Sequence, residues 1–394
     1  RKNQEKEEIY DFLDCKIGDY LDTIFEYEFP VVILPKELTL DAVCKVFQTI
    51  NSTGLKLSAF DICVAKFMRQ SIDLKSMVKD AEKTKYVKKV LDVDETLVLQ
   101  TIALLSGKSP KKSKLADGLE KHDIDNYWNR VIESMSTTMG LLDDFGAGTR
   151  KSLFLLPYKP VIPLFTAVLV NRDYKNLRID VKANIEQKIK LFFFYTALVS
   201  RYTEGTDNKL KEDYQLLLKW IISDQEPSGV SDGILWNTRK YITITKKSAF
   251  GKAVLCLINA QKPSDFYENK IVGVGENIET SQIHHIFPEA KYKGVAGESI
   301  NSIFNYTFLT SEANNFISNK DTRKYISEIL QTRCISEKTF KGVLHKHIID
   351  EECYKYFCSE EYEQFLEKRA ECIRKKFVGM GIHIQNVSKE QIDE

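Results

Sequence analysis

The chain has 394 residues, 43% of them hydrophobic and 29% charged, and a formal net charge of +1. This length predicts two or three domains. The near-zero net charge excludes a protein that binds nucleic acid through its overall positive charge, so any affinity for nucleic acid must come from local basic patches. The longest apolar runs, 161–170 and 191–199, are too short to span a bilayer, and the charged N-terminus lacks the apolar segment of a signal peptide. The cysteines form no Cys-x-x-Cys pair, which predicts reduced core residues in the cytoplasm and no membrane contact.

The sequence of the N-terminal part predicts helices around one strand. Residues 1–29 carry apolar side chains at helical spacing, and Phe29–Pro35 is predicted to be a buried strand between two prolines. Ser58 is a predicted helix N-cap, and Gly107 ends a helix predicted over 96–105. Further helices are predicted over residues 128–145, 185–200, 248–260, 325–331, 353–357 and 361–377.

The middle of the chain predicts a helical connector with charged residues near its turns. Asp213 is the predicted start of one helix. Arg201, Asp207 and Asp213 are interpreted as members of structural ion pairs. Residues 224–245 mix Pro, Gly, Ser and Asp, a composition that predicts loops.

The most informative stretch is Gln282–Tyr325. His284 and His285 stand side by side near its start, and Asn305 and Asn314 follow. This spacing predicts a two-stranded ribbon followed by a short helix, folded around one metal ion.

The chemistry of phosphodiester hydrolysis matches these residue types. Hydrolysis needs a nucleophilic water, a base that takes its proton, and positive charge on the phosphate oxygens. Pro288 ends the strand just after the two histidines, so both are able to reach one cleft, one as metal ligand and the other as base. Ser311 is the predicted N-cap of the next helix, which places Asn314 in its first turn as a ligand from across the cleft. The alternative is a packed polar pair of histidines beside Ile283 and Ile286.

These residues resemble the HNH (ββα-metal) nuclease motif. The resemblance implies that His285 is the catalytic general base and that His284 beside it is a metal ligand. It also implies that Asn305 is the Asn of the catalytic motif, which ties the loop together, and that Asn314 is the last metal ligand. Asn315 replaces Asn314 if the alignment shifts by one residue. The family commonly has Asp at the position of His284. A carboxylate there favours Mg²⁺ or Mn²⁺, whereas an imidazole widens the choice of divalent metal toward Ni²⁺ or Zn²⁺.

A second resemblance lies near the N-terminus. Phe47, Asn51, Thr53-Gly54 and Asp61 resemble the Phe-x-x-x-Asn region of the GmrS-type domain, which has a ParB-like fold and an NTP-dependent role. The resemblance implies that Asn51 lines a nucleotide pocket, and the alternative is that it only makes a turn. The Asp-Gly-Gln-Gln-Arg motif of that domain is absent, so we expect either an N-terminally truncated piece or a lost nucleotide site.

Over most of its length the chain resembles GmrSD-like modification-dependent (type IV) restriction endonucleases. The resemblance implies a mainly α chain, with the C-terminal portion of a ParB-like α/β GmrS-type domain at 1–90, a helical connector at 91–245 and a ββα-metal, GmrD-type HNH domain at 246–394. It further implies a cytoplasmic DNA endonuclease of antiphage defence that cuts modified DNA under NTP-dependent regulation. One site cuts one strand, so double-strand breaks require two nicks or a homodimer. The alternatives are a nucleic-acid-binding regulatory protein with a degenerate nuclease domain, and an RNase on the same scaffold.

Other charged and sulfur-containing residues near the motif offer further sites. The predicted phosphate contacts are the basic residues that flank it, Lys291, Lys293, Lys320, Arg323 and Lys324. Cys353 and Cys358 permit a zinc knuckle, although no second cysteine pair accompanies them. His345 and His347 have His-x-His spacing but no third ligand nearby in the sequence, so a surface or capping role is predicted.

Overall fold

The computed structural model describes residues 58–386 except 269 and 276–280, together with the helix α2 (Asp19–Phe25) and some single residues of the N-terminal part. The chain divides into two compact units, Arg1–Leu57 and Ser58–Glu394. Asn51, the predicted nucleotide contact, lies outside the described residues. The domain divisions predicted after residues 90 and 245 concern relationship to a family and stay predictions.

The buried strand predicted between two prolines is wrong at the positions that the structure describes. Val31 and Ile33 are 78% and 87% exposed, and neither has strand conformation. A lone strand needs a partner for its backbone hydrogen bonds, and the described residues of this unit provide none.

The second unit is mainly helical, and local sequence signals explain where several of its helices begin and end. The helix α4 (Ala59–Met68) starts at Ser58, whose hydroxyl accepts a hydrogen bond from the Asp61 backbone N–H at 3.1 Å, as predicted. The helix α7 (Thr96–Leu105) matches the prediction and is followed by Gly107 with φ of 70°. The neighbouring elements are α5 (Leu74–Ala81), α6 (Val87–Leu91), α8 (Lys112–Gly118), α9 (Lys121–Leu142) and the π-helical turn η3 (Asp143–Ala147).

The centre of the unit is built around an apolar helix. The helix α10 (Val161–Asn171) packs against α7, α9 and α12, and its residues from Val161 to Val170 are buried. The helix is surrounded by protein, which explains why its sequence has no polar face. Its neighbours along the chain are η4 (Tyr174–Asn176), α11 (Ile179–Leu198) and α12 (Thr206–Ser223).

The charged residues of the connector have different environments. Asp213 lies inside α12 rather than at its start, because the helix already begins at Thr206 after Gly205. Its buried carboxylate is held by Arg201 at 2.5 Å. This contact confirms the predicted ion pair for these two residues. Asp207 has no cationic partner among the described residues and accepts a hydrogen bond from the Gln100 amide at 3.5 Å, so its predicted ion pair is wrong.

A pair of short strands joins regions that are far apart in the sequence. The strand β1 (Ile234–Trp236) pairs in parallel with β4 (Ile384–Asn386), Ile234 lying opposite Ile384. The sequence predicted only loops in this region. Parallel pairing leaves little local signal because the partner lies at the other end of the unit. The remaining elements of this region are α13 (Ser228–Ser231), α14 (Thr238–Ile242) and α15 (Ala249–Ala260).

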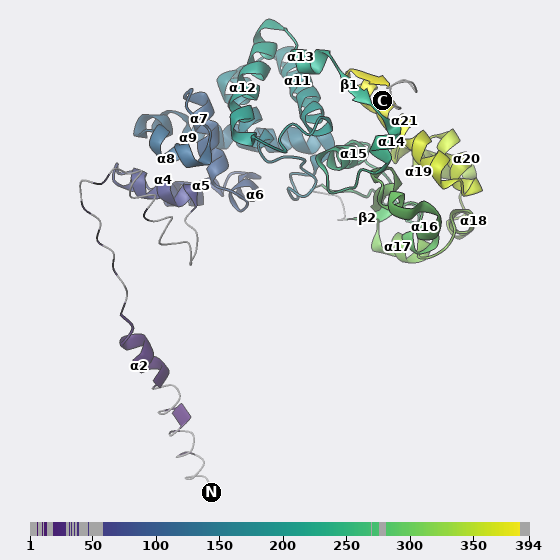
Figure 1. Ribbon diagram of the computed structural model, residues 1–394, viewed down its shortest axis with the longest axis horizontal. Coiled ribbons are helices and arrows are strands. Elements are labelled where there is room, and N and C mark those ends of the chain that lie inside the picture. The colour runs from purple at the N-terminus through teal and green to yellow at the C-terminus, as the bar shows by residue number, and fades with distance from the viewer. Residues whose placement is uncertain are drawn as a thin grey trace. The chain divides into compact units, whose positions relative to one another are not determined.

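A second pair of strands and a group of helices form the C-terminal part (Figure 1). The strand β2 (Gln282–His285) pairs with β3 (Tyr306–Leu309) in antiparallel register, and α17 (Ser311–Ile317) follows directly. The connection from β2 to β3 contains α16 (Glu289–Ala296), η5 (Gly297–Asn301) and η6 (Ile303–Asn305). The chain continues through α18 (Thr322–Thr332), α19 (Glu337–Lys346), α20 (Glu351–Ser359) and α21 (Tyr362–Gly379).

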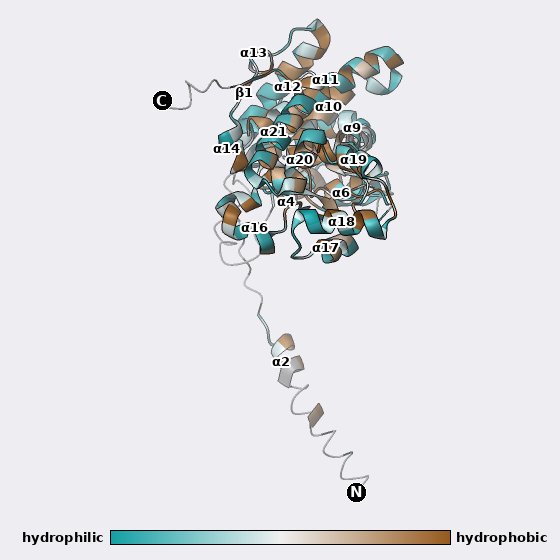
Figure 2. Cartoon of the chain, turned by 90° about the vertical axis from the view of Figure 1, so that its right-hand side faces the viewer, coloured by the Kyte–Doolittle hydropathy of each residue, from teal (hydrophilic) through white to brown (hydrophobic). Residues whose placement is uncertain are grey.

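An aromatic cluster fixes this pair of strands to the C-terminal helices. Phe287 is fully buried and its ring lies within 5.5 Å, centroid to centroid, of the Phe357 ring on α20 and within 4.9 Å of the Phe365 ring on α21. Most helices carry both hydrophobic and hydrophilic residues, as expected for helices packed on one side (Figure 2). Among the described helices, none has the length and apolar character needed to cross a membrane.

Candidate active site

The predicted order of strand, strand and helix is present at His284 and His285. These histidines are the last two residues of β2, where His285 pairs with Tyr306 of β3. Pro288 lies just before α16 with φ of −58°, so the chain turns away immediately after the histidine pair. The identity of this arrangement as an HNH motif stays a proposal.

Asn305 holds the two ends of the strand connection together. Its side chain is fully buried, its Oδ1 accepts the Phe287 backbone N–H at 2.8 Å, and its Nδ2 donates to the carbonyl oxygens of Phe287 and Ile300 at 3.2 and 3.0 Å. The Asn305 carbonyl also accepts the Ile286 N–H at 2.7 Å. Both the oxygen and the nitrogen of the Asn305 side chain are therefore hydrogen-bonded to the backbone, so this geometry gives Asn305 a positioning role.

His285 is held in one orientation by its neighbours. Its ring lies 4.3 Å from the Tyr306 ring, centroid to centroid, and its Nε2 is 3.3 Å from Oδ1 of Asn301. The Tyr306 hydroxyl donates to the same oxygen at 2.8 Å. An amide oxygen only accepts, so Nε2 of His285 carries the proton and Nδ1 is the basic nitrogen. Burial lowers the pKa of His285, against the opposing effect of the hydrogen bond to Asn301.

His284 has a buried ring nitrogen without a partner. Its Nε2 is inaccessible to solvent and has no hydrogen-bonding partner among the described residues. Burial, together with the nearby charges of Lys246 and His285, lowers the pKa of His284 to about 4. A buried polar atom without a partner is costly. An unprotonated imidazole nitrogen in this position fits the requirements of a divalent metal ligand.

Asn314 offers an oxygen ligand on the helix that follows the strands. It is half-buried in α17, and its side chain makes no hydrogen bond with any described residue. The N-cap of α17 is Thr310, whose hydroxyl accepts the Ala313 N–H at 3.0 Å. Ser311, the predicted N-cap, is already helical, because the preceding Thr310 has the extended backbone that a cap requires. Asn315, the alternative ligand, is exposed.

The structure adds Lys246, which sequence reasoning missed. Its Nζ lies 4.3 Å from the centroid of the Tyr306 ring and 3.5 Å from the carbonyl oxygen of Ile283 in β2. Burial lowers the pKa of Lys246, and Lys247 lowers it further, while Glu289 opposes this. No sequence signal connects Lys246 with the histidines, because the two segments meet only through the tertiary fold.

A glycine allows the loop that carries Lys246 to lie close to α15. A Cβ atom on Gly251 would lie 2.2 Å from the carbonyl oxygen of Thr245, closer than real side chains approach. The same loop accepts a hydrogen bond from the Ile303 N–H to the Ile244 carbonyl at 2.7 Å, just before β3. These two contacts fix Lys246 beside the strand pair.

A cavity of about 460 Å³ borders β2. It is lined by Lys151, Phe154, Lys246 and Ile283, among others. Phe154 is 61% exposed. Positive charge next to an exposed aromatic ring is the combination that binds single-stranded or distorted nucleic acid through phosphates and bases.

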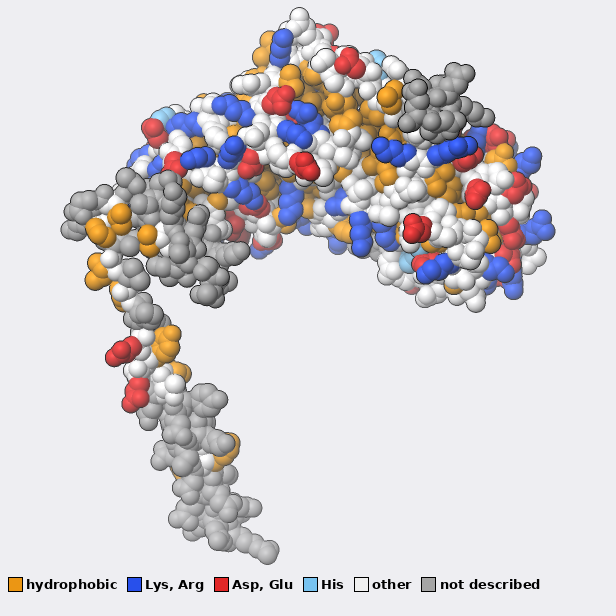
Figure 3. All heavy atoms as spheres, viewed as in Figure 1, with side chains coloured by type: hydrophobic (Ala, Val, Ile, Leu, Met, Phe, Trp, Pro, Cys, Tyr) orange, Lys and Arg blue, Asp and Glu red, His pale blue; other side chains and the backbone are white. Residues whose placement is uncertain are grey.

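The five predicted phosphate contacts are not equivalent. Lys291, Arg323 and Lys324 are exposed and have no ion pair with a described residue. Lys293 pairs with Glu289 at 3.2 Å. Lys320 pairs with Glu328 at 2.6 Å, with its Nζ 3.8 Å from the Phe316 ring centroid. On the face shown in Figure 3, basic and acidic side chains are interspersed, in agreement with the small net charge.

The surroundings of one thiol and one imidazole depend on partners that are distant in the sequence. Cys353 lies with its Sγ 3.9 Å from Sγ of Cys372. His345 is exposed, and His347 is the C-cap residue of α19, in agreement with the surface or capping role predicted for this pair. The His347 side chain is fully buried, with Nδ1 2.6 Å from the Thr307 hydroxyl and Nε2 2.7 Å from the Ser264 carbonyl.

No family model matches the chain. One similar protein is the uncharacterized protein MJ0686 of Methanocaldococcus jannaschii, which is 26% identical over 409 aligned positions that cover 92% of this chain. The chain spans 66% of the length of that relative.

Proposed function

We propose that the chain is a metal-dependent endonuclease of the HNH type that hydrolyses DNA phosphodiester bonds. The observation that supports it best is the histidine pair at the end of β2, joined to β3 and followed by α17, with Nε2 of His284 buried and without a partner among the residues that are described. In a residue that only supports the fold, a buried nitrogen without a hydrogen bond is unfavourable. In a metal ligand, the same nitrogen must be free to bind the ion.

His285 acts as the general base of the proposed reaction. Asn301 fixes the protonated Nε2 and leaves Nδ1 free to accept a proton from the attacking water. Asn305 positions the chain on both sides of the site through its hydrogen bonds. His284 and Asn314 are the residues that would hold a divalent cation, Mg²⁺ or Mn²⁺ with Ni²⁺ and Zn²⁺ as alternatives. Such an ion supplies positive charge for the phosphate and for the leaving 3′ oxygen.

The DNA contacts come from side chains around this site. Lys151, Phe154 and Lys246 line the cavity beside β2, and Arg323 and Lys324 are unpaired on α18. These groups bind the backbone through charge, so affinity falls as salt rises.

The biological setting of the proposal comes from the resemblance to GmrSD-like proteins. It comprises cleavage of modified DNA in antiphage defence, regulation by an NTP through the region of Asn51, and a homodimer for double-strand breaks. Each part has its own test. Cleavage rates on glucosylated and plain DNA test the preference for modified DNA, and cleavage with and without NTP tests the regulation. The mass of the particle that makes double-strand breaks tests the homodimer.

The central experiment is nicking of supercoiled plasmid in Mg²⁺ and in Mn²⁺. The wild-type chain is expected to cut, and His285→Ala is expected to lose roughly 10²–10⁴-fold in rate, the usual contribution of a general base. His122→Ala is the matched control, because His122 is an exposed histidine of α9 that pairs with Glu120, the N-cap of the same helix. Undiminished nicking by His285→Ala would remove His285 from the base role.

The same preparation separates the two alternatives. A wild-type chain that binds DNA but never cuts it in any divalent metal is a binding protein with a degenerate site. Preferential cleavage of RNA of the same sequence identifies an RNase on this scaffold.

A further inference from the structure

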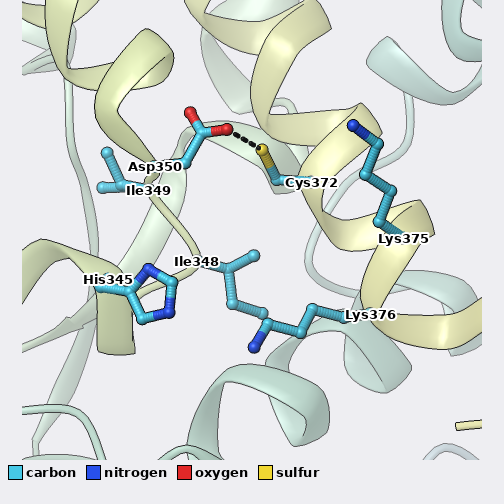
Figure 4. Close-up of a pocket in the computed structure, with 7 residues that line it drawn as sticks. All are labelled: His345, Ile348, Ile349, Asp350, Cys372, Lys375 and Lys376. Atoms are coloured by element: carbon cyan, nitrogen blue, oxygen red, sulfur yellow. Dashed lines mark hydrogen bonds between the residues drawn. The ribbon is translucent and has the colours of Figure 1, made fainter. Parts of the chain in front are cut away.

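The strongest cluster of potential ligands outside the proposed active site lies where α20 begins against α21. Cys372 Sγ is 3.1 Å from Oδ2 of Asp350 and 3.9 Å from Sγ of Cys353, and the three ligand atoms lie within 4.8 Å of one another. Figure 4 shows Asp350 and Cys372 facing each other across this junction. Among the described residues, Asp350, Cys353 and Cys372 are the group of three side chains with acidic, thiol or imidazole ligands that lie close enough together to hold one metal ion.

A buried positive charge stands next to this cluster, and no described carboxylate pairs with it. Arg369 on α21 is fully buried and donates to the carbonyl oxygens of Phe304, Tyr306 and His347 at 2.6–2.9 Å. Its Nε is buried without a hydrogen-bonding partner, and no described carboxylate forms an ion pair with it. A guanidinium stays charged in proteins, and a buried charge without compensation is strongly unfavourable. The site around Arg369 therefore calls for a nearby anion.

We propose that Asp350, Cys353 and Cys372 bind a zinc ion that joins α20 to α21. Two thiolates select zinc over the hard cations Mg²⁺ and Ca²⁺. With Zn–S bonds of about 2.3 Å, two thiolates of a tetrahedral site lie about 3.8 Å apart, close to the separation in this structure. Two thiolates, one carboxylate and Zn²⁺ have a net charge of −1, which balances Arg369. Binding releases the two thiol protons.

The local structure leaves the ligand atoms available. Oδ1 of Asp350 caps α20 by accepting the Cys353 N–H at 2.8 Å, so Oδ2 is the oxygen that faces the thiols. The ammonium of Lys368 forms its shorter ion pair with Glu352 and lies 4.0 Å from the same Oδ2 of Asp350, so Glu352 takes up most of its charge. A cavity of about 210 Å³ adjoins the cluster and is lined by His345, Ile348 and Cys372 among others. This cavity supplies space for a water molecule as the fourth ligand.

The zinc site has a role in the scaffold and is independent of the proposed hydrolysis. The helix α21 carries Arg369 to the carbonyl oxygens of Phe304, in η6, and of Tyr306, the first residue of β3. An ion that fixes α20 against α21 thereby holds the support of the strand pair.

The test measures metal content and spectra rather than cleavage. The full chain is purified with a reductant, stripped with a chelator and reloaded with Zn²⁺ or Co²⁺. We expect about one tightly bound Zn²⁺ per chain, and a thiolate-to-cobalt charge-transfer band with visible bands of tetrahedral Co²⁺. The melting temperature is expected to rise with Zn²⁺ and to fall with the chelator, because binding to the folded state stabilises it.

Asp350→Asn is the most informative variant. The asparagine oxygen keeps the helix cap, since Asn is as good an N-cap as Asp, while an NH₂ group replaces the ligand oxygen. We expect Zn²⁺ affinity to fall at least roughly 10-fold in this variant and the charge-transfer band to disappear in Cys372→Ser. Cys358→Ser is the matched control on α20, because Cys358 lies outside the cluster, and it should bind like the wild type.

Two outcomes contradict the proposal. The first is a reduced wild-type protein that gives no charge-transfer band and no retained Zn²⁺, or a Cys372→Ser protein that retains both. The second is a protein that is purified without reductant, is about 2 Da lighter by mass and has lost two reactive thiols, which identifies a disulfide between Cys353 and Cys372 in place of a metal site.

Discussion

Two buried polar centres of this molecule differ in whether their atoms are satisfied. Asp213 is fully buried, accepts hydrogen bonds from Arg201 at 2.5–2.8 Å, and also accepts one from the Tyr202 hydroxyl at 2.6 Å. His284 instead has a buried Nε2 with no hydrogen-bonding partner in the part of the chain that the structure describes. The first centre is complete without any ligand, so it belongs to the scaffold. The second leaves a buried nitrogen able to accept a ligand, which is the physical basis of the functional proposal.

Asp213→Asn is expected to have the largest effect on stability. It removes the carboxylate that neutralises Arg201 and leaves a largely buried guanidinium with only the exposed Glu212 beside it. The free energy of unfolding should fall by about 4 kcal/mol, within the range for breaking a buried ion pair. Urea denaturation of the two proteins measures the difference.

Asp207→Asn is the control for this change on the same helix. Among the described residues, the Asp207 carboxylate hydrogen-bonds only with the Gln100 amide, at 3.5 Å, so stability should change by less than about 0.5 kcal/mol. Equal losses in both variants would show that Asp213 and Arg201 do not form the scaffold centre described above.

The two motif asparagines provide a matched pair for the same comparison. Asn305→Ala removes hydrogen bonds to the backbone groups of Phe287 and Ile300 and leaves them unpaired, so stability should fall by about 3 kcal/mol. Asn314→Ala removes a side chain without a described partner, so stability should change by less than about 0.5 kcal/mol. The Mn²⁺ concentration that the Asn314→Ala variant needs for nicking should instead rise roughly 10-fold or more.

Denaturation and a Mn²⁺ titration of nicking distinguish these two asparagines. A large loss of stability in Asn314→Ala, with an unchanged metal requirement, would place Asn314 in the scaffold and leave His284 without its proposed co-ligand.

His347 provides a third test through pH. Burial lowers the pKa of His347 to about 3, and the charges of Arg369 and Lys346 also disfavour its protonated form. The pKa in the folded state is below the unfolded value of about 6.5, so its contribution is fully present above that pH. It is lost as pH falls toward 3, by up to about 1.4 kcal/mol per pH unit.

The measurement compares the wild type with His347→Gln by urea denaturation at pH 7 and pH 4.5. Other acidic groups affect both proteins, so the useful quantity is the difference between them. The wild type should lose about 2 kcal/mol more stability over this interval. Parallel pH profiles of the two proteins would contradict burial of a neutral His347.

The smallest expected effect is on DNA binding at low salt. Reversing two unpaired charges of α18, in Arg323→Glu/Lys324→Glu, should weaken binding roughly 10-fold and reduce the salt slope by about 2. Lys75→Glu/Lys79→Glu on α5 changes the net charge equally at exposed positions and is the control. Unchanged binding in the α18 variant would remove these residues from the DNA contact.

The parts of the fold that sequence reasoning predicted well depend on residues close together in the chain. The Ser58 cap with Asp61, the helix Thr96–Leu105 and the order β2, β3, α17 are fixed by local propensity, capping and turn residues. Its errors involve distant partners. The β1–β4 pair and the contact of Cys353 with Cys372 have no local signal, and the helix α19 was missed altogether.

The sequence by itself determined the residues that are able to do chemistry here: two adjacent histidines before a proline, with asparagines at suitable distances beyond them. Only the tertiary structure decided which atoms remain free. Asn305 uses all of its amide groups while His284 keeps one unpaired nitrogen, and Lys246 and Arg369 reach the strand pair from helices and loops far along the chain. Local sequence fixes backbone conformation, whereas the satisfaction of buried polar groups depends on partners that only packing brings together.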